Sequence, residues 1–154
     1  MYDVIIVGTD GSDTAAVAVE HATRLAASTG ATLHIVHVYQ TVSTGQIAMA
    51  ATAGAATGDF EEANAGSAAD SERICQRAAT NAQREGVKVE THARPGDAGD
   101  VLVGIAEEVG ADLLVIGNRG MSGVRRFVLG SVPNKVSHHC PCSLLIVDTT
   151  RRRS

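Results

Sequence analysis

The chain alternates short apolar segments with longer segments of helical character. Residues 2–8, 33–38, 112–117 and 143–148 are runs of mainly branched aliphatic side chains, and residues 87–93 alternate between apolar and polar ones. Between them apolar residues recur at helical spacing, as at Ala98, Leu102 and Ile105. This order predicts a single α/β domain: a doubly wound, Rossmann-like sheet of five mostly parallel strands with helices on both faces.

Glycines mark the ends of the helical segments. Helices are predicted from the turn at residues 9–13 to about residue 28, over 67–84, over 98–109 and over Ser131–His139. Gly30, Gly86 and Gly110 lie just after the first three, where a glycine commonly closes a helix. A chain of 154 residues suits one domain, assigned to residues 1–150, with a basic tail at 151–154.

Residues 40–66 do not fit the alternation. The segment is rich in Ala, Gly, Thr and Ser and has almost no large apolar side chains. Such a composition buries too little apolar surface to offset the entropy lost on ordering. We predict a mobile insertion, with at most a partial helix, that acts as a lid or a partner-binding segment.

Composition excludes several classes of function. The net charge is −4, and the chain has no Trp, two Phe and two Tyr, which disfavours binding of nucleic acid by charge or by stacking. No apolar run reaches the length of about 18 residues typical of a membrane span, and the N-terminus lacks signal-peptide features. Three cysteines form no disulfide framework, so a cytoplasmic location is expected.

A glycine-rich loop follows the strand predicted over residues 112–117. Gly117 and Gly120 let backbone N–H groups converge on an anion, and Gly130-Ser131 opens the next helix, with Ser131 as its predicted N-cap. Helix N-termini bind phosphate groups, and ligands of doubly wound sheets lie beyond the carboxyl ends of the strands. The sequence therefore predicts a nucleotide site at this loop.

Basic side chains in and just after the loop bear on the choice of nucleotide. Arg119, Arg125, Arg126 and Lys135 would suit the polyphosphate of ATP, with Mg²⁺ accompanying it. Cyclic AMP, the alternative ligand, carries a single charge and needs at most one or two of them. ATP is therefore the first expectation.

The spacing Gly117-x2-Gly120-x9-Gly130-Ser131 resembles the adenine-nucleotide signature of the ATP-binding universal stress proteins. The segments VIIVGTDGSD and CPCSLLIVD are similar to that family's first and last strands, so the resemblance covers nearly the whole chain. It implies a regulatory stress-response protein that binds an adenine nucleotide. It also implies a homodimer formed by antiparallel pairing of the last strand, Ser143–Val147. A nucleotide-free dimeric interaction module is a further alternative.

The resemblance carries over to individual residues. Asp10 takes the place of a ribose-binding acid, and Val38 that of a backbone group that meets adenine. The full set implied to bind nucleotide is Gly8, Thr9, Asp10, Val38, Ile116, Gly117, Arg119, Gly120, Gly130, Ser131 and Val132. From the residues alone, Asp10 is either a ribose acceptor or the start of an Asx turn, and both roles can coexist.

No catalytic or metal site is predicted. No nucleophile–base pair can be inferred and no P-loop occurs, so any ATP hydrolysis should be slow. Residues 138–142 (HHCPC) crowd a helix end too closely to surround one ion. His34 and His37 stand three apart on one strand, so they face opposite sides and are not a ligand pair. Cys75 is expected in the core.

Overall fold

The strands form one parallel sheet in the computed structural model, which describes residues 1–118 and 129–149. The strands are β1 (Val4–Gly8), β2 (Thr32–Tyr39), β3 (Val89–Pro95), β4 (Leu113–Gly117) and β5 (Ser143–Val147). They hydrogen-bond in the order β3-β2-β1-β4-β5, and every pairing is parallel. The predicted five-stranded, doubly wound α/β fold is confirmed.

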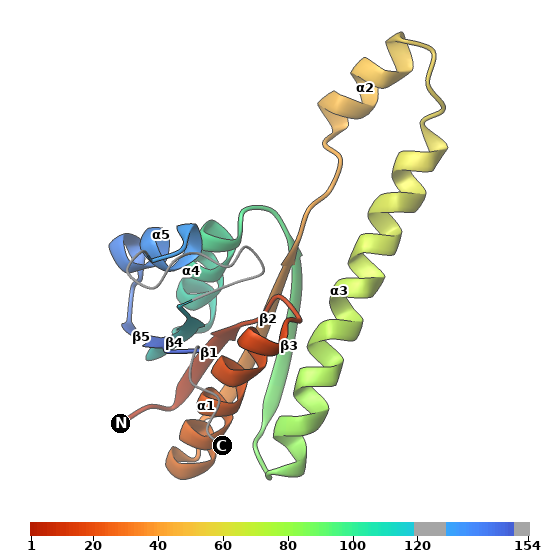
Figure 1. Cartoon of the computed structure of the whole chain (residues 1–154). Coiled ribbons are helices and arrows are strands. Elements are labelled where there is room, and N and C mark those ends of the chain that lie inside the picture. The colour runs from red at the N-terminus through yellow and green to blue at the C-terminus, as the bar shows by residue number, and fades with distance from the viewer. Residues whose placement is uncertain (119–128, 150–154) are drawn as a thin grey trace.

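Helices cover both faces of this sheet (Figure 1). They are α1 (Asp13–Thr29), α2 (Thr44–Thr52), α3 (Gly58–Arg84), α4 (Ala98–Val109) and α5 (Ser131–His139). Helices α1 and α3 pack on one face and α4 and α5 on the other. Each face therefore has its own hydrophobic core, as a parallel sheet requires.

Side-chain alternation along the strands supplies both cores. In β1, Ile5 and Val7 face α1 and α3, whereas Ile6 faces α4 and α5. The α1 face is lined by alanines such as Ala18 and Ala22, which are fully buried and let the helix approach the sheet closely. The apolar runs of β1, β2 and β4 were recognisable because both sides of these strands are buried.

The helix ends follow local capping rules. Ser12 caps α1 by accepting a hydrogen bond from the N–H of Ala15, and Asp97 caps α4 in the same way through the N–H of Asp100. Gly30 and Gly110 close these two helices in the left-handed conformation, with φ of 78° and 63°. The predicted ends of these helices are confirmed.

The segment 40–66 is more helical than predicted. It contains α2, and α3 begins at Gly58 rather than near residue 67. Alanine favours helix without any core to pack against, and a capping box between Ser43 and Gln46 starts α2. Helix α2 buries none of its residues and extends with the first turns of α3 as an arm beyond the sheet (Figure 1). Its mobility and its role as a lid stay predictions.

Strand β3 extends two residues beyond the alternating segment 87–93. Arg94 and Pro95 belong to the strand, opposite Val38 and Tyr39 of β2. Proline is tolerated there because β3 lies at the edge of the sheet, where its missing N–H breaks no ladder. The chain turns only at Gly96, whose φ is 134°.

The winding of the sheet reverses between β1 and β4. From β1 the chain proceeds outward through β2 and β3, then crosses back and adds β4 and β5 on the other side of β1. Ligands of such sheets lie where the carboxyl ends of these two strands diverge. Strand β5 is the second edge, as predicted. Within the described ranges no helix is both long and apolar enough to cross a bilayer.

Candidate functional site

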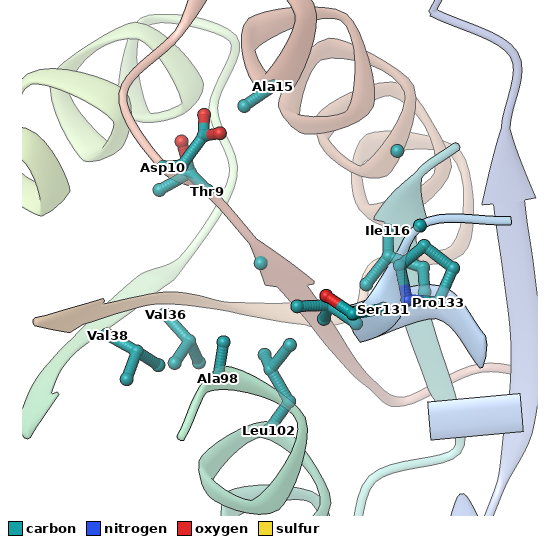
Figure 2. Close-up of a pocket in the computed structure, with 14 residues that line it drawn as sticks. Thr9, Asp10, Ala15, Val36, Val38, Ala98, Leu102, Ile116, Ser131 and Pro133 are labelled. Carbon is teal, nitrogen blue, oxygen red and sulfur yellow. The ribbon is translucent and has the colours of Figure 1, made fainter. Parts of the chain in front are cut away.

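A pocket of about 180 Å³ opens at this point of reversal (Figure 2). It lies at the carboxyl ends of β1, β2 and β4 and beside the first turns of α1, α4 and α5. Its lining residues are Gly8, Thr9, Asp10, Ala15, Val36, Val38, Ala98, Leu102, Ile116, Gly117, Gly130, Ser131, Val132 and Pro133. The structure therefore brings together every predicted site residue that falls within its described part.

Arg119 and Gly120, the other two predicted site residues, lie outside the described residues, as do Arg125 and Arg126. The pocket wall is thus defined by the strand ends and by the start of α5.

The turn after β1 positions the carboxylate of Asp10. The N–H of Thr9 donates to the carbonyl of Val36 at 2.9 Å, which ties the turn to β2. Asp10 Oδ1 accepts the N–H of Ser12 at 2.9 Å and its hydroxyl at 2.5 Å. This is the Asx turn that was one of the two interpretations of Asp10, and it leads directly into the cap of α1.

One wall of the pocket is apolar. Val36 and Val38 come from β2, Ile116 from β4, and Ala98 and Leu102 from α4. Gly8 forms part of the floor, where an added Cβ would lie 3.2 Å from a methyl carbon of Leu102. An apolar slot between strand ends and a helix suits a flat heterocycle.

The opposite end of the pocket is the N-terminus of α5. Gly130 occupies the N-cap position, and no side chain caps the helix. The prediction that Ser131 is the N-cap is wrong: Ser131 is the first helical residue, because the backbone of Gly130 is still extended. Helical hydrogen bonding begins with the N–H of Asn134, which donates to Gly130. The first-turn N–H groups have no partner within the helix, which is the geometry that binds anions.

Lys135, counted among the cations for a polyphosphate, is engaged elsewhere. Its Nζ lies 3.0 Å from Asp97 Oδ1 and 2.8 Å from Asp100 Oδ1, joining α5 to the start of α4. Hydrogen bonds to Asp100 and Asp97 raise the pKa of Lys135, and the N–H of Asp100 and the Lys135 ammonium lower the pKa of Asp97. Sequence spacing could not show this pairing, because Asp97 lies 38 residues before Lys135.

Two polar residues tie down the strand ends next to the pocket. Asn118 Oδ1 accepts the N–H of Thr149 at 3.0 Å and its hydroxyl at 2.8 Å, which fixes the end of β4 to the residues after β5. His37 lies near the end of β2, and its Nδ1 is 2.6 Å from the hydroxyl oxygen of the fully buried Ser71 on α3. His34 and His37 face opposite sides of the sheet, as predicted.

Three histidines have pKa values below the ordinary 6.5: His34, His37 and His92. Burial is the main cause in each case. For His37 the carboxylate of Asp10 opposes it. For His34, the charge of Glu90 raises the pKa and that of Lys88 lowers it further. For His92, the charges of His34 and Arg94 lower the pKa with burial, and those of Glu108 and Glu90 raise it.

These shifts predict acid lability in a defined window. The unfolded chain takes up protons near pH 6.5 that the folded chain does not, so stability should fall as the pH drops from 7.5 to 5.5. Thermal melts followed by circular dichroism measure the slope. His37→Gln, which keeps a partner for Ser71, should flatten it, and the exposed pair His138→Gln and His139→Gln should not. A slope that His37→Gln leaves unchanged would contradict the assignment.

The architecture defines the class: a doubly wound α/β domain with a small-molecule pocket at its switch point, closed at one end by a helix N-terminus. The chain belongs to the universal stress protein family, whose family model matches residues 1–148. Universal stress protein Rv1636 of Mycobacterium tuberculosis is 37% identical over 150 residues, or 97% of this chain and 98% of that protein.

Two further relatives agree over nearly their full length. Universal stress protein YxiE of Bacillus subtilis is 31% identical over 147 residues, or 96% of this chain and 99% of its own. A crystal structure of a universal stress protein in complex with cAMP is 33% identical, covers 97% of this chain and 98% of its own, and superposes with a TM-score of 0.68. The family and its fold are thus shown together.

Proposed function

We propose that this protein binds an adenine nucleotide in the switch-point pocket and acts as a dimeric regulator rather than an enzyme. One observation carries the proposal: an apolar slot, a strand-end carboxylate and a glycine-opened helix N-terminus line one cavity. The slot between Val38 and Leu102 would take the base, and Asp10 a ribose hydroxyl. The backbone N–H groups of Ser131 and Val132 would take a phosphate.

Cyclic AMP is the nucleotide that we favour over ATP. Lys135 is committed to two carboxylates of α4, which removes one of the cations that suited a polyphosphate. The related structure with cAMP, 33% identical to this chain, supports the same choice. ATP remains the second candidate because of the glycine signature and of the arginines at positions 119, 125 and 126.

Competition calorimetry tests the choice. We expect cyclic AMP to bind more tightly than ATP, with an affinity that does not depend on Mg²⁺, since its single phosphate charge needs no metal. Ser131→Ala, which removes the hydroxyl and keeps the backbone N–H, should weaken binding mildly, by about 0.5–1.5 kcal/mol if the hydroxyl also donates to the phosphate. Tighter binding of ATP would overturn the preference and leave the adenine site in place.

Two controls sharpen the comparison. Lys135→Ala should change neither affinity, and a selective loss of ATP binding would mean that Lys135 reaches a polyphosphate. Mass spectrometry of molecules released on denaturation should detect an adenine nucleotide. Absence of any nucleotide together with no binding by calorimetry would favour the nucleotide-free interaction module.

We expect hydrolysis of a bound nucleotide to be slow at most. Among the described residues that line the pocket, Asp10 is the one ionisable side chain, and its Oδ1 already holds the turn before α1. No general base paired with a nucleophile is found in that lining. Binding, rather than turnover, is the function that this set of residues supports.

We infer that dimers form through β5. This strand lies at the edge of the sheet, and the apolar side chains of Leu144, Leu145 and Ile146 are only half-buried. An exposed apolar edge favours pairing with another strand. Antiparallel pairing of two β5 strands would extend the sheet across both protomers.

A further inference from the structure

A cluster of metal-ligating side chains lies on the sheet away from the nucleotide pocket. His34 stands on β2 directly opposite Glu90 of β3, and His92 follows two residues further along β3. In β2, Leu33 and Ile35 face α1 and α3, so His34 and both β3 residues face the side of α4 and α5. The three side chains thus project from two neighbouring, hydrogen-bonded strands.

The donor atoms of this cluster already converge. His34 Nδ1 lies 2.9 Å from His92 Nε2 and 3.8 Å from Glu90 Oε2, and one donor atom from each residue falls within 4.8 Å of the others. The ring centroids are 5.2 Å apart at 23°. At this separation the two nitrogens face each other across a single hydrogen bond.

The spacing suits a tetrahedral ion. Zinc holds imidazole nitrogens at about 2.0–2.1 Å, which places two of them about 3.3–3.4 Å apart. The histidine nitrogens would therefore separate by only a few tenths of an ångström. The half-exposed Glu90 side chain can rotate to follow. Coordination also requires the shared hydrogen to move to the other nitrogen of its own ring, with no net loss of a proton.

The surroundings favour the neutral, metal-binding form of both rings. His34 is buried with a side-chain exposure of 7%, and burial lowers the pKa of His34 and of His92. Two basic side chains, Lys88 and Arg94, and two acidic ones, Glu90 and Glu108, act on the rings, so the nearby charges balance. Neutral imidazoles on a rigid sheet beside a carboxylate form a ligand set typical of zinc sites.

We propose that His34, His92 and Glu90 bind one divalent transition-metal ion of the zinc class, with water as the fourth ligand. The site links β2 to the edge strand β3 and is separate from the residues that line the nucleotide pocket. Sequence reasoning missed it because it compared His34 with His37 on the same strand. The partner of His34 stands 58 residues away, and only the strand register reveals it.

Titration of the untagged protein with Zn²⁺ against a chromophoric chelator tests the site. We expect one ion per chain and a higher melting temperature with zinc. His92→Gln should lower the affinity by more than the roughly 10–100-fold typical of second-shell changes. Glu90→Gln should lower it less. Melts without zinc check that each variant is folded.

A matched control removes two of the three thiols of the chain, those of Cys140 and Cys142. Burial and the neighbouring Cys140 raise the pKa of Cys142 to about 12, so its thiol is protonated at neutral pH in the absence of metal. The double variant Cys140→Ser and Cys142→Ser should bind zinc as the unmodified protein does. Co²⁺ should give the strong visible bands of a four-coordinate site, lost in His92→Gln. Failure to bind zinc, or equal binding by a folded His92→Gln, would overturn the proposal.

Discussion

Gly130→Val should abolish nucleotide binding and leave the fold intact. The backbone of Gly130 has φ −58° and ψ 168°, which any residue adopts. Among the described residues, the nearest neighbour of an added Cβ would be Pro133 Cδ, at an ordinary 3.6 Å. The fold therefore has no need for glycine at this position. A phosphate approaching the first turn of α5 does need it, because a side chain would stand between the ligand and the N–H groups.

Calorimetry with cyclic AMP measures the loss of nucleotide binding, and a thermal melt measures whether the fold is kept. We expect no measurable binding by Gly130→Val, an intermediate loss for Gly130→Ala, and melting temperatures close to that of the unmodified protein. Gly104→Ala is the matched control, since Gly104 lies within α4 with open space around it and should keep full affinity. A folded Gly130→Val that binds normally would contradict the site. Gly120, the other glycine predicted to approach a phosphate, lies outside the described residues.

Ile146→Pro should break the proposed dimer and leave folded monomers. The N–H of Ser143 donates to the carbonyl of Asp112, so by alternation the N–H groups of Leu145 and Val147 point toward β4. Those of Leu144 and Ile146 point outward, toward the edge where a second β5 would pair. Proline at position 146 removes an outward donor, whereas Leu145→Pro removes a bond within the sheet.

Sedimentation velocity at micromolar concentration measures the effect. We expect dimers from the unmodified protein, monomers from Ile146→Pro with a cooperative melt, and a large loss of stability from Leu145→Pro. A monomeric unmodified protein would show that β5 does not pair. So would an Ile146→Pro variant that stays fully dimeric.

The parts of the fold that sequence predicted are those that local physics determines. Burial on both sides made β1 and β4 recognisable as apolar runs, and left-handed glycines fixed the ends of α1 and α4. The predicted start of α3 was wrong because the low apolar content of residues 40–66 was taken as a sign of disorder. Alanine propensity and the Ser43 capping box need no core to form a helix.

Site residues that lie at the ends of strands and helices could be predicted from the sequence. Contacts that depend on helix packing or on strand register could not. Gly8 ends β1, Asp10 follows it and Gly130 caps α5, so topology alone brings them to one pocket. The pairing of Lys135 with Asp97 depends on how α5 packs against α4, which no local pattern encodes. The histidine cluster likewise needs the register of β2 and β3.

The pocket is built from two parts of the chain that are made at different times. Asp10 and Val38 come from the first strands, whereas Gly117 and Ser131 come from β4 and α5. The seam between these parts is the pairing of β1 with β4, where the N–H of Val4 donates to Asp112 across 108 residues. Such distant pairing forms late in folding, after most of the chain has left the ribosome. A bound nucleotide, which contacts both parts, would therefore stabilise the joined state over the unfolded chain.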